Sequence, residues 1–297
     1  MLVDLLRCPT CRAAMNVGTY EAVCRTNGHR FPIAEGVLVM VDEDELRSDP
    51  QYGRQRRYFD AEFAHYADGG AEAWRLSYLR RLRAGGVLGD PEAALIDVGV
   101  GGSGYTVIEA ARAGSPAVGC DLSLEGLVRA SRLARAAGVA DRTLWVCCTA
   151  ERLPFASSAF ASALAIAVIE HVPDDDTALS EIARVLRPAG RAWVTVPHAL
   201  RNIAPVFRPA NRRHDRRLGH LRRYEAESLA NAGRRFGLEV VDVQFTGHGV
   251  KAIQLAASKF LHGRIGERFW WWCEARDLRR SQRRRGSMQL SVLFSRT

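Results

Sequence analysis

The chain has 297 residues, which is long enough for one large domain and a small one. Hydrophobic residues make up 47% and charged residues 25%, as in an ordinary globular protein, and no run of 18 apolar residues predicts a transmembrane helix. The amino terminus lacks the charged and apolar regions of a secretory signal, so we expect a cytoplasmic protein.

The net charge of +9 is concentrated in two segments. Residues 201–223 carry eight arginines and one aspartate, and residues 264–285 carry eight arginines and three acidic residues around Trp270–Trp272. Guanidinium groups bind phosphates and carboxylates, and tryptophans beside arginines are typical of membrane interfaces. The segments predict contact with an anionic acceptor, RNA or, through 264–285, a membrane surface. Solvated loops and packed tryptophans are the simpler alternative. We expect no DNA partner.

Residues 1–45 contain four candidate metal ligands. Cys8 and Cys11 share a Cys-Pro-Thr-Cys turn, and Cys24 and His29 follow on a second turn. Three thiolates and one imidazole suit a tetrahedral Zn²⁺ ion, and a closed set of four protein ligands is structural. A module of about 40 residues buries too little core to fold without such support. We therefore predict a small zinc-binding β module, with unliganded thiols as the alternative.

Residues 46–90 are charged and carry aromatic residues at helical spacing, which predicts a helical linker. An apolar run, 94–98, then breaks into the glycines of residues 99–104, and a second apolar run ends at Asp121. Glycine allows φ > 0 and lets a ligand lie against bare backbone. A carboxylate after the second strand can accept hydrogen bonds from both hydroxyls of a ribose. The pattern predicts a nucleotide-type ligand, and a tight turn without a ligand is the alternative.

Strands and helices alternate from residue 91 to residue 197, which predicts an α/β domain with a parallel sheet and helices on both faces. Acidic residues open a predicted helix over 225–236, and alternation predicts strands over 238–245 and 288–294. Residues 91–297 therefore form the main domain. Two segments are predicted as insertions that shape a substrate site, 198–223 and 249–286.

Four motifs in this domain resemble the class I S-adenosylmethionine (SAM) methyltransferases, in particular the ubiquinone and menaquinone methyltransferase branch. They are the glycine turn, Glu151-Arg-Leu-Pro-Phe155, Ile169-Glu-His-Val-Pro173 and Leu186-Arg-Pro-Ala-Gly190. The resemblance implies a Rossmann-like, mostly parallel sheet with an antiparallel last strand. It also implies a helical lid, so Tyr58, Phe59 or Tyr66 of the linker is expected near SAM.

The amino-terminal segment is similar to the zinc-ribbon module that precedes the SAM domain in some rRNA guanine methyltransferases. The resemblance also implies how SAM is held: the glycine turn holds the methionine part, Asp121 the ribose, and residues 149–151 the adenine. Thr149 stands where the family usually has an aspartate. The implied cofactor residues are Asp97, Gly99, Gly101, Gly102, Asp121, Leu122, Thr149, Ala150, Glu151 and Ile169.

Methyl transfer from SAM requires a positioned acceptor and, for a hydroxyl or carbon acid, removal of a proton. An imidazole suits this task near neutral pH. The candidate bases either follow the strands or lie in the connection after them: His171, His198, His214 and His220. A cluster of histidine and aspartate could instead hold a divalent ion. The expected contacts to the acceptor are Arg213, Arg217, Arg223 and Tyr224.

The function we predict is methylation of oxygen or carbon in a small, lipophilic or anionic biosynthetic intermediate, with SAM as cofactor and a structural zinc ion. Two alternatives remain open at this stage. The zinc-ribbon-like order and the basic segments favour an rRNA base methyltransferase, although no Asn-Pro-Pro-Tyr motif is present. The departure at Thr149 leaves room for a non-catalytic activator or scaffold with the same fold.

Overall fold

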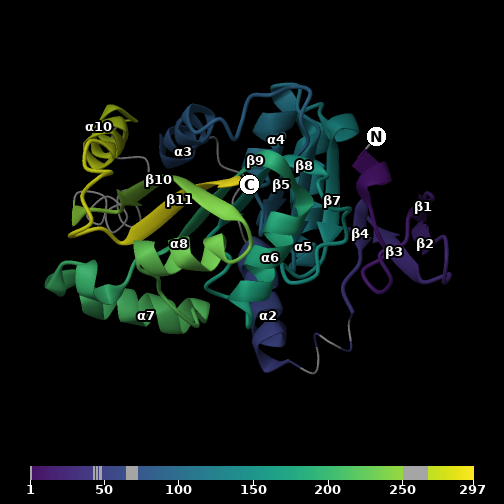
Figure 1. The fold of residues 1–297 in the computed structure, drawn as a ribbon, viewed down its shortest axis with the longest axis horizontal. Coiled ribbons are helices and arrows are strands. Elements are labelled where there is room, and N and C mark those ends of the chain that lie inside the picture. Colours follow the sequence, from purple (N-terminus) through teal and green to yellow (C-terminus); the bar gives the residue numbers. More distant parts are fainter. Residues whose placement is uncertain (1, 43, 45, 47–48, 65–72, 250–266) are drawn as a thin grey trace.

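The computed structural model describes residues 2–42, 44, 46, 49–64, 73–249 and 267–297, which form one layered molecule (Figure 1). Within these residues, the strands form a single sheet in the order β1-β2-β3-β4-β7-β6-β5-β8-β9-β11-β10. The strands are β1 Met15–Val17, β2 Glu21–Cys24, β3 Arg30–Ala34, β4 Val37–Val39, β5 Leu95–Val98, β6 Ala117–Asp121, β7 Thr143–Cys147, β8 Phe160–Ile166, β9 Leu186–Pro197, β10 Leu238–Thr246 and β11 Gln289–Arg296.

Strands β4 to β9 pair in parallel, and β11 lies antiparallel between β9 and β10. This arrangement confirms the mostly parallel sheet with an antiparallel last strand. All four residues of β5 and the first four of β6 are buried, as expected for strands covered on both faces.

Helices cover both faces of the sheet. One face packs against α3 (Ala73–Ala84), α4 (Tyr105–Arg112) and α5 (Leu124–Ala136), and the other against α6 (Asp175–Val185) and α8 (Ala226–Arg234). The remaining helices are α2 (Pro50–Ala64), α7 (Arg208–Leu218) and α10 (Glu267–Leu278), with short 3-10 turns at Leu2–Leu5, Ala140–Arg142, Leu200–Asn202 and Pro205–Phe207. None of the described helices has both the length and the apolar character needed to span a bilayer.

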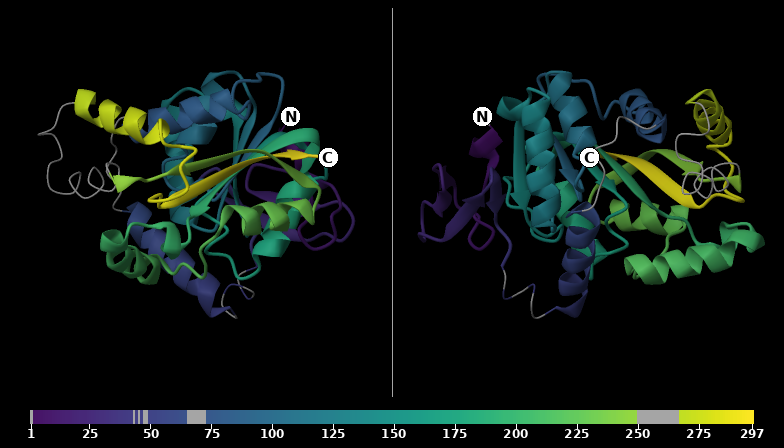
Figure 2. Two further views of the ribbon diagram at one scale, coloured as in Figure 1. Left: turned by 60° about the vertical axis from the view of Figure 1, so that its left-hand side comes forward. Right: turned by 180° about the vertical axis from the view of Figure 1, so that it is seen from behind.

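The amino-terminal strands extend the main sheet at its β7 edge. Val37–Val39 pairs in parallel with Trp145–Cys147, and Leu6 forms a bridge with Phe155. The Arg12 guanidinium donates to the Leu153 carbonyl and contacts Glu181 of α6. Figure 2 shows the purple strands at one end of the sheet and β10 and β11 at the other. The first 40 residues are therefore joined to the core by strand pairing.

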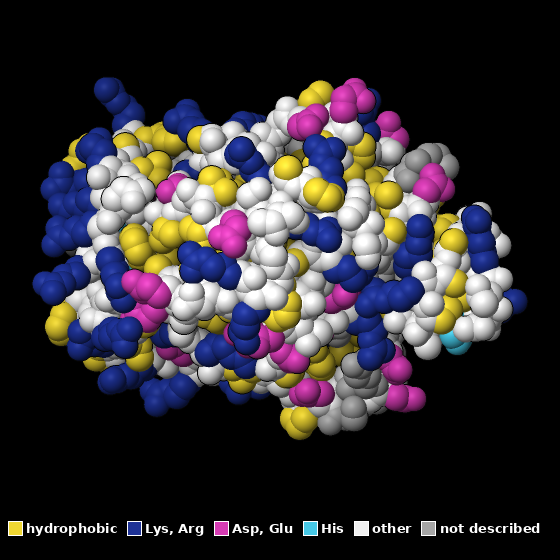
Figure 3. Space-filling view, in the orientation of Figure 1, with side chains coloured by type: hydrophobic (Ala, Val, Ile, Leu, Met, Phe, Trp, Pro, Cys, Tyr) yellow, Lys and Arg dark blue, Asp and Glu magenta, His cyan; other side chains and the backbone are white. Residues whose placement is uncertain are grey.

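The arginine-rich part of the predicted insertion 198–223 forms a helix, α7 (Arg208–Leu218), for which no secondary structure was predicted. No residue of α7 is fully buried, yet its apolar residues fall on one helical face: Ala210 and Leu218, with Phe207 just before the helix, line a cavity at the carboxyl ends of the parallel strands. Their spacing is a signal from which the helix could have been predicted. The helix ends at Gly219, which adopts a left-handed φ of 73°. Exposed arginines gather along the side of the molecule where α7 and α10 lie (Figures 1 and 3).

The tryptophan-rich segment also forms a helix, α10. Arg80 of α3 lies over the ring of Trp271, 4.5 Å from its centroid, while Phe269 and Trp272 remain exposed. The segment therefore packs one tryptophan on the body of the protein and presents another to solvent. Residues 250–266 of the predicted insertion, and Tyr66 of the predicted lid, lie outside the described residues.

Candidate active site

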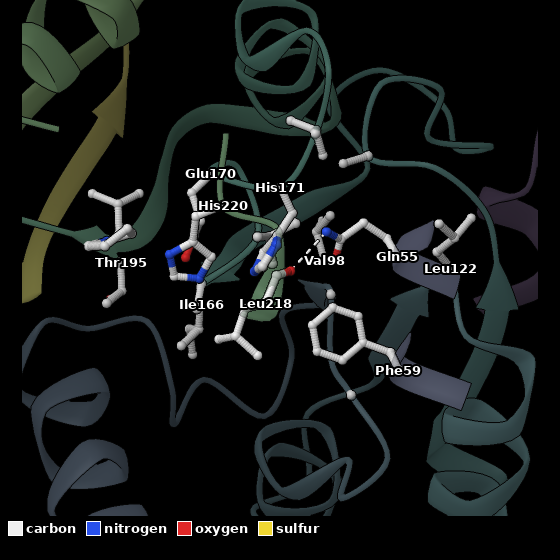
Figure 4. Close-up of a pocket in the computed structure, with 18 of the residues that line it drawn as sticks. Gln55, Phe59, Val98, Leu122, Ile166, Glu170, His171, Thr195, Leu218 and His220 are labelled. Atoms are coloured by element: carbon white, nitrogen blue, oxygen red, sulfur yellow. Dashed lines mark hydrogen bonds between the residues drawn. The ribbon is translucent and has the colours of Figure 1, made fainter. Parts of the chain in front are cut away.

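A cavity of about 930 Å³ opens at the carboxyl ends of β5, β6, β8 and β9. Ligands bind at this edge in open parallel sheets, where the strand order reverses. Helix α2 covers one side of the cavity with Gln55 and Phe59, and α7 contributes Leu218 (Figure 4). The amide of Gln55 donates to the Leu218 carbonyl at 2.9 Å and so ties the two helices together.

The glycine turn forms part of the cavity wall. Gly99 has a φ of +73°, and a β-carbon on it would lie 2.2 Å from Cγ2 of Val168. Gly101 has a φ of +64° and lines the cavity. Its amide donates to the Asp121 carboxylate at 2.8 Å. Only glycine satisfies both the backbone angle and the space at position 99.

Asp121 lies at the tip of β6, on the cavity wall. Its two carboxylate oxygens accept hydrogen bonds from the backbone amides of Gly101 and Ser123, at 2.8 and 2.9 Å. Burial raises the pKa of Asp121. Each carboxylate oxygen keeps a further lone pair, so the fixed side chain can still accept a hydrogen bond from a ligand.

Thr149, Ala150 and Glu151 line the cavity beyond the tip of β7. The hydroxyl of Tyr52 on α2 donates to Oε1 of Glu151 at 2.5 Å, and Oε2 is buried without a hydrogen-bond partner. Burial raises the pKa of Glu151. Tyr52 was not among the predicted site residues, because an aromatic residue on a linker helix usually serves packing.

Glu170, His171 and His220 lie together on the cavity wall (Figure 4). Burial raises the pKa of Glu170 to about 8 and lowers that of His171 to about 3. Burial also lowers the pKa of His220, whose Nδ1 lies 2.8 Å from the Asp215 carboxylate. The cavity thus joins a glycine turn with an acidic strand tip to a cluster of imidazole and carboxyl groups.

Residues 96–194 match the family model described as a methyltransferase domain. This part of the chain is a class I methyltransferase domain. Two of its curated relatives are the methyltransferase GfsG of Streptomyces halstedii, 35% identical over 97 residues, and the demethylmenaquinone methyltransferase of Corynebacterium kroppenstedtii, 32% identical over 134 residues. The alignments cover 33% and 45% of this chain, and 35% and 52% of the relatives. The chain therefore matches about a third to a half of their length.

Two solved structures share the fold of the methyltransferase domain and its flanking elements. The geranyl diphosphate C-methyltransferase of Streptomyces coelicolor has a TM-score of 0.59 at 17% identity, and the match covers 84% of this chain and 99% of that chain. The [4+2]-cyclase SpnF has a TM-score of 0.57 at 23% identity, covering 83% and 95%. At these identities the likeness is one of fold alone.

The structure sorts the predicted cofactor residues of the methyltransferase domain into two groups. Three do not line the cavity: Asp97, Gly102 and Ile169. Asp97 is buried behind the turn, where it accepts a hydrogen bond from the Thr106 hydroxyl, and burial raises its pKa to about 7. The other seven line the cavity: Gly99, Gly101, Asp121, Leu122, Thr149, Ala150 and Glu151.

The expectation that all four candidate bases face the acceptor does not hold for His198. The side chain is fully buried and does not line the cavity. Its Nδ1 lies 2.7 Å from the Ser287 hydroxyl, and its Nε2 lies 2.9 Å from the Asn202 amide. Burial lowers its pKa to about 4. Both ring nitrogens are occupied, so His198 supports the chain around β9, whereas His171, His214 and His220 line the cavity.

The predicted acceptor contacts also need correction. Arg213 and Arg217 are exposed on α7 and do not line the cavity, and Tyr224 is buried with its hydroxyl 2.7 Å from Asp175. Arg223 lines the cavity, but its guanidinium donates to both oxygens of Asp215 at 2.8 and 2.7 Å. Arg223 is therefore engaged by Asp215 rather than left for an acceptor. The spacing of the two residues in the sequence does not indicate this pairing. The cavity residues that the prediction missed include Gln55, Phe207, Asn211, Leu218 and Met288.

The four predicted metal ligands of the amino-terminal segment lie together, outside the cavity. One ligand atom from each of Cys8, Cys11, Cys24 and His29 lies within 4.8 Å of the others. The Cys8 sulfur is 3.3 Å from His29 Nδ1, and the Cys11 and Cys24 sulfurs are 3.4 Å apart. Hydrogen bonding from the Asn27 amide lowers the pKa of Cys24 to about 6. Ligands in a tetrahedral zinc site are separated by roughly 3.5 Å, so these residues fit the ion.

Proposed function

We propose that this protein transfers a methyl group from SAM to an oxygen or carbon atom of a small-molecule acceptor. The observation that carries the proposal is that the glycine turn with Asp121 and the histidine cluster line one and the same cavity. The sulfonium of SAM already activates its methyl group, so the chain has to align the acceptor and remove its proton. In this proposal the part of the cavity lined by the glycine turn, Asp121 and Thr149 is the cofactor end, and the part lined by Glu170, His171 and His220 is the acceptor end.

The cofactor end provides a position for each part of SAM. The bare backbone of Gly99 and Gly101 gives room for the methionine part, and the carboxylate of Asp121 is fixed to accept hydrogen bonds from the ribose hydroxyls. Thr149 is buried on the cavity wall and offers a hydroxyl to the adenine in place of the more common carboxylate. This set supports SAM binding despite the departure at Thr149.

The acceptor end has apolar walls and few polar groups. Ile166, Phe207 and Leu218 supply apolar surface, whereas the polar groups include the histidine cluster, Asn211 and Thr195. Such a site suits a lipophilic molecule that carries a hydroxyl or an acidic carbon. The curated relatives include enzymes named for demethylmenaquinone, norajmaline and ubiquinone biosynthesis, which agrees with a small molecule as acceptor.

His214 is the base that we propose for this reaction. It lines the cavity from α7, and its ring centroid is 5.7 Å from that of His220. His214 is exposed, so its imidazole can pass a proton on to water. His171 is the less suitable base because its burial opposes protonation.

We also propose that Cys8, Cys11, Cys24 and His29 hold a structural zinc ion. Four protein ligands leave no open coordination position for catalysis. The ion would join the turn before β1 to the β2–β3 turn, in a segment whose strands bury few large side chains.

Calorimetric titration with S-adenosylhomocysteine tests the cofactor site. We expect the wild-type chain to bind and the Asp121→Ala variant to lose at least tenfold in affinity, while Asp141→Ala, an exposed aspartate outside the cavity, binds normally. A wild-type chain that fails to bind would be a non-catalytic scaffold.

A [4+2]-cyclase shares this fold, so cofactor binding alone does not establish methyl transfer. The second experiment incubates the protein with methyl-labelled SAM and a cell extract, and then separates small molecules from RNA. Label in the organic-soluble fraction supports the proposal. Label confined to RNA would favour the rRNA alternative, and no label in either fraction would contradict methyl transfer.

A further inference from the structure

We propose that Glu170, His171 and His220 bind a divalent cation of the zinc class at the acceptor end of the cavity, and that this ion orients an acceptor with two neighbouring oxygen atoms. The metal site follows from the geometry of the three side chains. Its role in orienting the acceptor rests on the proposed function.

The three side chains converge from two distant segments. Glu170 and His171 follow β8, and His220 follows α7, yet one ligand atom from each lies within 4.8 Å of the others. The ring centroids of His171 and His220 are 4.7 Å apart (Figure 4). Two imidazoles and a carboxylate at this separation need only small side-chain movements to reach a common ion.

Two atoms of this cluster are buried without a hydrogen-bond partner. They are Oε2 of Glu170, whose residue is 1% exposed, and Nδ1 of His171. Burying a polar atom without a partner is unfavourable, and native proteins leave few such atoms. A cation held by both residues would supply the missing partner.

His220 is oriented as a metal ligand usually is. Its Nδ1 lies 2.8 Å from the carboxylate of Asp215, which leaves Nε2 to offer a lone pair. Ligating histidines commonly donate their second ring N–H to a carboxylate, which fixes the ring and its tautomer. Arg223 holds Asp215 through two hydrogen bonds and also donates to the His198 carbonyl at 2.8 Å. The predicted substrate arginine thus acts as a positioning residue for the cluster.

The ligand set points to a metal class and to a type of acceptor. Two histidines and one carboxylate bind Zn²⁺ and related transition ions, whereas Mg²⁺ and Ca²⁺ prefer oxygen ligands. Three protein ligands leave coordination positions open toward the cavity. Because Ile166, Phe207 and Leu218 line the same end, the matching acceptor is an apolar molecule with a catechol-like or hydroxy-carbonyl pair of oxygens.

The ion would assist methylation of oxygen by lowering the pKa of the hydroxyl that it contacts. The O–H bond breaks and its proton passes to the imidazole of His214. An oxygen lone pair then forms the bond to the methyl carbon while the S–CH₃ bond breaks. The sulfonium becomes the neutral thioether of S-adenosylhomocysteine, so charge and atoms balance without a further reactant.

Metal analysis of the purified full-length chain tests the site independently of activity. With zinc in the growth medium, we expect two zinc ions per wild-type chain, one of them at the amino-terminal cluster. His220→Asn and Glu170→Gln should each retain one ion, and His29→Ala should also retain one. His214→Ala is the matched control, because this histidine lines the same cavity outside the cluster, and it should retain two ions.

One zinc ion in the wild-type chain together with one in His220→Asn would overturn the proposal, as would two ions in both. A variant that binds S-adenosylhomocysteine with an affinity within about twofold of wild type is folded. If Glu170→Gln does not fold, the metal content of His220→Asn alone decides the test. Asp215→Asn should lower the affinity of this cluster for zinc about 10- to 100-fold. Two zinc ions without any binding of S-adenosylhomocysteine would reject the proposed function and leave the metal site standing.

Discussion

Phe63 of α2 lies directly against Gly102 of the glycine turn. A β-carbon on Gly102 would sit 2.9 Å from Cγ of the Phe63 ring and 3.0 Å from its Cβ. The same ring would lie 2.6 Å from a β-carbon on Gly126 of α5. Helix α2 therefore packs on the turn through the Phe63 ring. The absence of side chains at Gly102 and Gly126 makes room for this ring.

This contact predicts that Gly102→Ala destabilises the protein by about 1–3 kcal/mol, because the added methyl group overpacks the contact with Phe63. Urea denaturation measures the change. The cost of Gly102→Ala should be smaller when it is measured in the Phe63→Ala background than when it is measured in the wild type. Equal losses in both backgrounds would show that the cost comes from elsewhere than the ring.

Asp97 makes the stability depend on pH. Its folded pKa of about 7 lies above the ordinary value of 3.8 because the carboxyl group is buried. Between these two values the unfolded chain is ionised while the folded chain keeps its proton, so this group lowers the stability as pH rises toward 7. Asp97→Asn should therefore be more stable than wild type at pH 8, by up to about 4 kcal/mol, and the difference should fade toward pH 4.

Chemical denaturation of wild type and Asp97→Asn at pH 5 and pH 8 measures this difference. The exposed Asp141→Asn variant serves as the control, and we expect it to follow the wild type at both values. A difference between Asp97→Asn and wild type that does not change with pH would contradict the assignment.

Removal of the zinc ion that we propose for Cys8, Cys11, Cys24 and His29 should increase the opening of β1 to β4 while the central strands stay protected. The Met40 amide donates to the Cys147 carbonyl at 2.8 Å, so hydrogen exchange at Met40 reports on the joint between the segment and the sheet. Chelator treatment or Cys8→Ser should accelerate exchange in this segment and leave β5 protected. Cys148→Ala, which alters a buried thiol outside the cluster, should keep the ion. Unchanged exchange after chelation would argue against a structural role.

Two histidines should respond in opposite ways to the same substitution. His198→Asn removes buried hydrogen bonds to Ser287 and Asn202, so we expect a loss of about 1–3 kcal/mol in stability with little change in kcat of the folded protein. His214→Asn should leave stability unchanged and lower kcat about 10²- to 10⁴-fold, with unchanged affinity for S-adenosylhomocysteine. A large fall in kcat for folded His198→Asn would restore that residue as a candidate base.

Local patterns in the sequence determine the sheet, the glycine turn and the tip of β6. Apolar runs indicate buried strands, and the glycines or Asp121 that follow mark where each strand ends. Both signals lie within short stretches of the chain, so these features could be predicted. The four ligands of the amino-terminal cluster could also be predicted, because two short turns carry them.

Only the tertiary structure decides which polar side chains meet. It turns His198 away from the cavity, brings His220 to Glu170 and His171 across 49 residues of chain, and pairs Arg223 with Asp215. It also places one face of α7, with Ala210 and Leu218, on the cavity wall. The physical reason is that periodicity records whether a residue is buried, whereas its partners depend on contacts between segments far apart in the chain.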